Sequence, residues 1–252
     1  MGGAPAEPRF IDRFSDRASL YRQARPTYPA RLFETLAALA PGRDLAWDCG
    51  AGNGQAAVAL SRHFAQVHAS EPSREQLAEA AQADRINYRC ERAEDVALPD
   101  ASVDLAMAAQ AMHWFDLDLY FAQLRRVLKP GGIVAAIGYD WMYVDEPIDA
   151  AVSERLMPLL APHWAPQNAL LWAGYRSIPF PGEEVRLGPF AIHLDWSFPQ
   201  VRDYILSWSA SRALQAVTGA TALDGALEAL AQLWGERRHL TMPLFVRAAR
   251  IG

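Results

Sequence analysis

The strongest constraint on the fold of this chain is a glycine-rich segment, Gly-Ala-Gly-Asn-Gly at residues 50–54, which directly follows a short apolar run. The run, Leu45–Cys49, has the length and composition of a buried strand, and the Ala-rich segment 55–64 predicts a helix. Glycines at a strand-to-helix turn allow the backbone to approach a ligand closely. We therefore predict a ligand-binding strand–turn–helix unit at this point of the chain.

The acid before the first glycine indicates the kind of ligand. Dinucleotide-binding turns have the pattern Gly-x-Gly-x-x-Gly, and here Gln55 stands where that pattern needs its third glycine. Asp48 would repel a pyrophosphate, whereas it could receive a cationic amino group. The segment therefore favours a ligand with a nucleoside and an ammonium group, and it disfavours a nicotinamide-dependent oxidoreductase.

Predicted strands and helices alternate through the first 140 residues. Apolar residues at helical spacing predict helices over 28–40 and 116–128, and Ser73 with Gln76 forms a capping-box signature for a helix that extends to Ala83. Residues 129–132 predict a turn. Strands are predicted at Leu45–Cys49, Val67–Ser70, Ile86–Cys90, Val103–Ala108 and Ile133–Tyr139. This alternation indicates a parallel, doubly wound α/β sheet.

The motifs in this core resemble those of class I S-adenosylmethionine-dependent methyltransferases over about residues 44–139. The resemblance implies that Glu71, at the end of the second strand, binds ribose hydroxyls and that Ala93 and Glu94 contact adenine. The segment 128–132 resembles the turn before the family's fifth strand. The implied fold is a doubly wound, mostly parallel seven-stranded Rossmann-like sheet with an added helical cap. The implied cofactor is S-adenosylmethionine, with S-adenosylhomocysteine as product.

The flanking segments resemble a narrower group, the trans-aconitate methyltransferase-like enzymes, whose characterised members methylate small molecules. The matching positions are Phe14, Tyr21, Arg25-Pro26, Tyr28-Pro29, residues 111–116 and residues 204–210. This resemblance implies a small-molecule acceptor that has a carboxylate, hydroxyl, amine or carbon nucleophile. A noncatalytic S-adenosylmethionine-binding or scaffold protein is the alternative.

The second half of the chain has a less regular pattern. Six prolines between 141 and 184 are expected to interrupt any long element. Residues 185–196 alternate loosely as an edge strand does, residues 200–211 and 222–235 predict helices, and residues 244–251 predict a final strand. The expected organisation is an N-terminal arm or lid (1–27), a cofactor-binding core (28–140), a substrate cap insertion (141–240) and a C-terminal strand (241–252).

The candidate site residues fall into three groups. The expected cofactor-binding residues are Asp48, Gly50, Gly52, Gly54, Glu71, Ala93, Glu94, Gln110 and Arg25. The expected acceptor-side residues are Tyr21, Tyr28, Trp114 and Trp141. His113 is the candidate catalytic residue, with a buried structural histidine as the competing interpretation. A carboxylate acceptor needs no base, because its pKa of about 4 leaves it ionised, whereas a phenol, amine or carbon acid would use His113.

The amino-acid composition limits the classes of ligand and binding partner that we expect for this chain. Six of the eight tryptophans lie at or beyond Trp141, which indicates an aromatic acceptor pocket in the second half of the chain. The net charge of −5 disfavours nucleic acid, and the two cysteines, Cys49 and Cys90, have no metal-site spacing. No apolar run reaches the roughly 20 residues of a membrane span. We expect a cytoplasmic monomer or homodimer without a metal, a membrane or a nucleic-acid partner.

Overall fold

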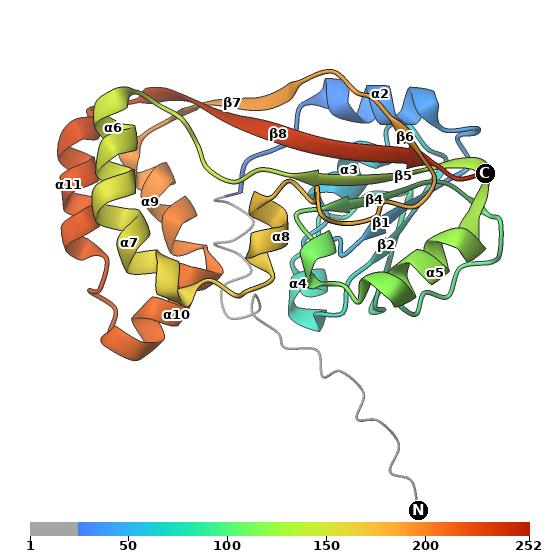
Figure 1. Ribbon diagram of the computed structural model, residues 1–252, viewed down its shortest axis with the longest axis horizontal. Coiled ribbons are helices and arrows are strands. Elements are labelled where there is room, and N and C mark those ends of the chain that lie inside the picture. Colours follow the sequence, from blue (N-terminus) through green and yellow to red (C-terminus); the bar gives the residue numbers. More distant parts are fainter. Residues whose placement is uncertain (1–24) are drawn as a thin grey trace, which may run out of the picture.

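The computed structural model describes residues 25–252, in which an open α/β sheet lies beside a group of helices (Figure 1). The predicted acceptor-side residue Tyr21, like Phe14, lies outside the described residues. The five parallel strands of the sheet are β1 (Leu45–Cys49), β2 (Gln66–Ser70), β3 (Ile86–Arg89), β4 (Val103–Ala109) and β5 (Leu128–Gly138).

The strand order places the ends of β1 and β4 side by side at the centre of the sheet. The order is β3-β2-β1-β4-β5-β8-β6, and β8 (Arg238–Arg250) runs antiparallel to β5. The chain order reverses between β1 and β4, and open α/β sheets bind ligands at the carboxyl ends of strands at such a point. The predicted doubly wound, mostly parallel sheet is confirmed.

The sheet has eight strands in the described residues, one more than predicted, because a short strand precedes the predicted strand over 185–196. The two are β6 (Glu183–Val185), which overlaps the predicted range only at Val185, and β7 (Phe190–Trp196), and both pair with β8. The intervening residues include Gly188 and Pro189. Proline has no backbone N–H for the ladder, so the pairing with β8 is interrupted there and resumes at Phe190.

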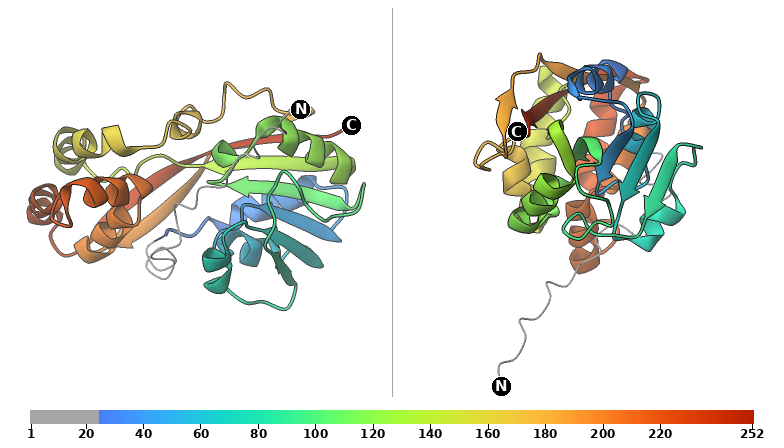
Figure 2. Two further views of the ribbon diagram at one scale, coloured as in Figure 1. Left: turned by 90° about the horizontal axis from the view of Figure 1, so that it is seen from below. Right: turned by 90° about the vertical axis from the view of Figure 1, so that its right-hand side faces the viewer.

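Helices cover both faces of the sheet (Figure 2). The helices α2 (Ala30–Leu39) and α3 (Gln55–Leu60) pack on one face, and α5 (Leu117–Val127) and α8 (Asn168–Trp172) pack on the other. Alternate residues of β4 supply the two cores: Leu105 and Met107 face α2 and α3, whereas Ala106 and Ala108 face α5. This alternation follows from the period of two in a strand.

Two local predictions in the core were wrong in detail. The helix α4 (Arg74–Ala78) begins as predicted, with Ser73 Oγ accepting the Gln76 N–H at 3.2 Å, but it ends five residues before Ala83. The predicted turn over 129–132 lies inside β5 as a bulge, because Leu128 pairs with Val103 and Ile133 with Leu105. Gly131 has a φ of 76° there, and its N–H donates to the Ile251 carbonyl.

The remaining helices form a cap with its own apolar core at the far end of β7 and β8 (Figure 1). They are α6 (Glu146–Ala151), the π-helical turn η3 (Val152–Leu156), α7 (Met157–Leu160), the 3₁₀ turn η4 (Ala161–His163), α9 (Phe198–Leu206), α10 (Ser209–Thr218) and α11 (Asp224–Trp234). In the described residues, no helix is long and apolar enough to cross a membrane.

The expectation that prolines interrupt this region was wrong for residues 146–163, where helical turns follow one another. Pro147 lies in the first turn of α6, where its missing N–H costs nothing. The π-helical turn η3 changes the hydrogen-bond spacing just before Pro158, which has no N–H to donate. The predicted helix over 200–211 is likewise two helices, α9 and α10, separated at Ser207 and Trp208.

Candidate active site

The three glycines after β1 form a tight turn with a left-handed backbone. The φ values are 69° at Gly50, 55° at Gly52 and 83° at Gly54, a region that favours glycine. The carbonyl of Ser70, at the end of β2, accepts the N–H groups of Gly50 and Ala51 at 2.9 and 3.0 Å. This anchors the turn to the neighbouring strand. A Cβ at Gly52 would meet no atom within 4 Å, because Gly52 borders open space.

Asp48 places a buried carboxyl group directly under this turn. Its side chain is 1% exposed, and neither oxygen has a hydrogen-bond partner in the described part of the chain. Burial, against the opposing effect of the nearby backbone N–H of Ala57 and with a smaller contribution from the negative charge of Glu71, raises the pKa of Asp48 to about 7. A buried carboxylate without a partner is costly, so this position favours a cationic ligand group.

Glu71 follows β2 and faces the same turn. One carboxylate oxygen accepts the Gly52 N–H at 3.0 Å, and the other accepts the Ser73 N–H at 2.9 Å. These two contacts fix the orientation of the carboxylate beside the glycine turn. A carboxylate held in this way can accept hydrogen bonds from two neighbouring hydroxyl groups.

Asp48, Gly50, Gly52, Glu71, Ala93 and Glu94 line one cavity of about 370 Å³, the cofactor cavity. Ala93 is buried, and Glu94 Oε1 accepts the backbone N–H of Asp116 at 2.9 Å. Tyr28, which we predicted on the acceptor side, lines this cavity as well. Gly54 does not line it; a Cβ at Gly54 would lie 2.0 Å from the Tyr88 hydroxyl, so this glycine allows close packing.

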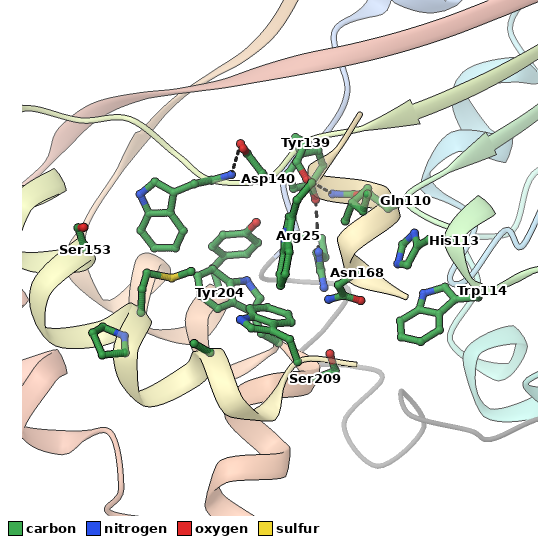
Figure 3. Close-up of a pocket in the computed structure, with 18 residues that line it drawn as sticks. Arg25, Gln110, His113, Trp114, Tyr139, Asp140, Ser153, Asn168, Tyr204 and Ser209 are labelled. Atoms are coloured by element: carbon green, nitrogen blue, oxygen red, sulfur yellow. Dashed lines mark hydrogen bonds between the residues drawn. The ribbon is translucent and has the colours of Figure 1, made fainter. Parts of the chain in front are cut away.

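A second cavity, of about 600 Å³, lies between the sheet and the cap, and we call it the acceptor cavity (Figure 3). It is lined by His113 and by Trp141, Trp164, Trp172 and Trp208. The other two late tryptophans pack in the cap instead, where Trp234 Nε1 donates to the Trp196 carbonyl at 2.9 Å. The tryptophan distribution therefore marks both the wall of a cavity and the core of the cap.

The two cavities share four lining residues, Arg25, Gln110, Trp114 and Tyr139. Gln110 directly follows β4 and has a φ of 55°, which is uncommon for a residue with a Cβ. Its Nε2 donates to the Tyr139 carbonyl at 2.9 Å, and the Tyr139 hydroxyl accepts from Arg25 at 3.4 Å (Figure 3). The ends of β4 and β5 are thereby joined at the boundary between the cavities.

His113 lies on the 3₁₀ turn η2 (Met112–Trp114) and faces the acceptor cavity. Its Nδ1 is 3.0 Å from the hydroxyl of Tyr175, which is fully buried and has a φ of 56°. Burial lowers the pKa of His113 to about 3 and raises the pKa of Tyr175. The imidazole is therefore neutral at physiological pH, and it is a hydrogen-bonding group rather than a strong base.

The structure also identifies site residues that the sequence did not. Tyr139, Asn168 and Tyr204 line the acceptor cavity, and Tyr175 lies behind His113. Tyr204 lies in the segment that resembles the trans-aconitate methyltransferase-like group. Asn168 begins α8 in the proline-rich region, where no periodic pattern distinguishes it from other polar residues.

Comparison with known proteins agrees with this geometry. The model of the methyltransferase domain family matches residues 47–136. A protein of Dictyostelium discoideum, provisionally named a methyltransferase, is 32% identical over 213 residues, which cover 83% of this chain and 81% of the relative. An uncharacterised methyltransferase of Mycobacterium tuberculosis is 34% identical over 135 residues, 53% of each chain.

A solved structure from Anaeromyxobacter dehalogenans, provisionally described as a type II methyltransferase, is 42% identical and superposes with a TM-score of 0.83. The match covers 90% of this chain and 97% of that one. The chain belongs to the class I S-adenosylmethionine-dependent methyltransferases, and its cofactor is S-adenosylmethionine.

The residues of the cofactor cavity fit this cofactor. The unpartnered carboxyl of Asp48 suits the ammonium of the methionine moiety, and the open space beside Gly52 leaves room for a ligand against the backbone. The carboxylate of Glu71 suits the two ribose hydroxyls, because it lines this cavity, its orientation is fixed by two backbone N–H groups, and carboxylate oxygens accept hydrogen bonds from hydroxyls. The assignment of each residue to each group remains a prediction.

Proposed function

We propose that this protein transfers a methyl group from S-adenosylmethionine to a small molecule bound in the acceptor cavity. The observation that carries the proposal is the meeting of the two cavities at Arg25, Gln110, Trp114 and Tyr139. A donor in one cavity and an acceptor in the other would approach each other at this boundary.

The size and position of the acceptor cavity support a small acceptor. A volume of about 600 Å³ lies within the range of about 300–1,000 Å³ typical of small-molecule sites. The cavity lies between the cap and the sheet, and most of its wall is apolar or aromatic side chain. Such a wall excludes water from the reactants, which prevents hydrolysis and strengthens polar contacts with the ligand.

The chemistry requires alignment more than proton transfer. The cofactor supplies a methyl group on a sulfonium, and its transfer to an acceptor lone pair breaks the carbon–sulfur bond with the electron pair remaining on sulfur. Asp48 and Glu71 hold the cofactor end, and the acceptor cavity fixes the nucleophile. Gln110 and Trp114 line both cavities, which supports a role for them in orienting the reacting groups.

The proposal can be tested with a donor that has an isotope-labelled methyl group. The purified full chain is incubated with this donor and a cell extract, and label is measured separately in small molecules, proteins and nucleic acids. We expect label in compounds below about 1,000 Da, and we expect Asp48→Ala to abolish S-adenosylhomocysteine binding and labelling together. Label in a macromolecular fraction alone, or no label with a folded and cofactor-binding protein, would overturn the proposal.

A further inference from the structure

We propose that the acceptor cavity selects a flat aromatic molecule with an anionic oxygen group, such as a hydroxylated aromatic carboxylic acid. This inference rests on the proposed function, because it assigns a substrate class to the same site. Three features carry it: the arrangement of indole rings, the unpaired buried polar atoms of residues that line the cavity, and the charge of its lining.

The indole rings form a continuous aromatic wall. Trp208 lies at the centre, with its ring centroid 5.1 Å from that of Trp141 and 5.7 Å from that of Trp164. Trp172 continues the wall at 5.7 Å from Trp164, at an interplanar angle of 90°. Rings at these angles present both faces and edges to the cavity, which suits a flat aromatic ring more than a branched aliphatic chain.

Buried polar atoms in the same wall lack partners. The indole Nε1 atoms of Trp141 and Trp164 have no hydrogen-bond acceptor within the described part of the chain. The Oδ1 atom of Asn168 has no hydrogen-bond donor there. Asn168 is only 4% exposed. An unpaired buried polar group is destabilising, and a ligand that pairs with it removes this cost. Two indole donors suit ligand oxygens, and the Asn168 carbonyl suits a ligand hydroxyl.

The charge of the lining favours an anion over a cation. The guanidinium of Arg25 lies 5.6 Å from the centroid of the Tyr204 ring, and Arg25 lines the cavity together with Tyr204 and His113 (Figure 3). Asp140 is the acid among the lining residues, but it is exposed and accepts the backbone N–H of Trp141. An ammonium ligand would therefore meet a resident cation, whereas a carboxylate or phenolate would meet a counter-charge.

The experiment compares three probes by titration calorimetry on the full chain, with and without S-adenosylhomocysteine. The probes are 3-hydroxy-2-naphthoate, 2-naphthylmethylammonium and the aliphatic acid tricarballylate. We expect the aromatic acid to bind at least tenfold more tightly than either of the others. Equal or tighter binding of the ammonium or of the aliphatic acid would overturn the inference, as would absence of aromatic-acid binding.

Two variants localise the effect. Trp164→Phe keeps an aromatic ring and removes the indole donor, so aromatic-acid affinity should fall about three- to tenfold. Arg25→Met should lower it at least tenfold and abolish the preference over the ammonium. Tyr143→Phe is the control, because Tyr143 is half-exposed and lies outside the cavity lining. Unchanged aromatic-acid binding in both cavity variants would overturn the assignment to this cavity.

The outcome is separable from that of the proposed function. S-adenosylhomocysteine affinity of each variant is measured in parallel, since Arg25 also lines the cofactor cavity. Failure of the proposed function appears as absent methyl transfer to any small molecule. Failure of the present inference appears as normal cofactor binding and methyl transfer with a preference for aliphatic or cationic acceptors.

Discussion

The hydroxyl of Tyr175 lies 3.0 Å from Nδ1 of His113, behind the wall of the acceptor cavity. Tyr175 reaches this place with a left-handed backbone at the end of α8, where its N–H donates to the Leu170 carbonyl at 2.9 Å. If the hydroxyl donates to Nδ1, the proton of the neutral imidazole lies on Nε2, which can then donate to an acceptor oxygen. We therefore predict that Tyr175 is a positioning residue for His113.

His113→Ala should reduce kcat about tenfold and leave S-adenosylhomocysteine affinity unchanged, because His113 lines the acceptor cavity only. With the pKa of His113 lowered to about 3, the kcat of the wild-type enzyme should show no inflection from this group between pH 5 and 8. Steady-state kinetics over this range provide the measurement. An inflection near pH 6.5 that disappears in His113→Ala would show instead that His113 titrates as a base.

Tyr175→Phe should lower kcat by a smaller factor, about threefold, with the KM for the cofactor unchanged. The phenyl ring retains the packing against Phe245 and loses only the hydroxyl. Loss of thermal stability without a change in kcat would assign Tyr175 to packing rather than to positioning.

The raised pKa of Asp48 predicts pH-dependent cofactor binding. Below about pH 7 the folded, unliganded protein holds this carboxyl protonated, so it has no charge to pair with the ammonium of the cofactor. Affinity for S-adenosylhomocysteine should therefore be highest above pH 7 and should fall about tenfold per pH unit below it. Calorimetry from pH 5.5 to 8.5 measures this dependence. Asp48→Asn should weaken binding and remove the pH dependence.

The same carboxyl has the opposite effect on the stability of the unliganded protein. Between pH 3.8 and about 7 it ionises in the unfolded chain but stays protonated in the folded one, so its contribution to the free energy of unfolding falls as pH rises. At pH 8, Asp48→Asn should thus raise the free energy of unfolding by about 2–4 kcal/mol. Urea unfolding without cofactor provides the measurement; a less stable variant at pH 8 would contradict the prediction.

More of the lining of the cofactor cavity than of the acceptor cavity could be named from the sequence, for a physical reason. Asp48, the glycine turn and Glu71 lie at strand ends, and period and turn chemistry locate strand ends in a parallel sheet. Asn168 and Tyr175 reach the acceptor cavity through the packing of α8 against the sheet, which no local pattern records. The tryptophan distribution indicated an aromatic pocket, but only the fold separates Trp164 and Trp208 from Trp196 and Trp234.

Gly52 and Gly54 offer a matched pair of substitutions. Gly54→Ala would place a Cβ 2.0 Å from the Tyr88 hydroxyl at a φ of 83°, so we expect a loss of about 2–4 kcal/mol of stability. Gly52→Ala meets no atom, so it should cost only about 1–2 kcal/mol, from its positive φ. Its methyl group borders the cofactor cavity, however, and should weaken S-adenosylhomocysteine binding at least tenfold.

Thermal unfolding and calorimetry on the two variants separate these effects. Tyr88→Phe, introduced into Gly54→Ala, removes the closest of the clashing atoms and leaves Cζ at 2.8 Å, so it should recover part of the lost stability. If Gly52→Ala bound S-adenosylhomocysteine normally, the glycine turn would not contact the cofactor.

Lys129 stabilises the N-terminal ends of the central strands, on the side of the sheet opposite the site. Its Nζ lies 2.9 Å from Asp104 Oδ1 and 2.9 Å from Asp44 Oδ2, and the Asp104 side chain is fully buried. Lys129→Met leaves Asp104 with backbone N–H groups alone, from Asp44 and Leu45, so the free energy of unfolding should fall by about 2–4 kcal/mol. Asp44→Asn is the control: Asp44 is 84% exposed, so its loss should cost at most about 0.5 kcal/mol.

Since both residues lie away from the two cavities, S-adenosylhomocysteine affinity should stay within twofold of wild type in both variants. A large loss of affinity in Lys129→Met with little loss of stability would show that the bulge in β5 serves the cofactor rather than the fold.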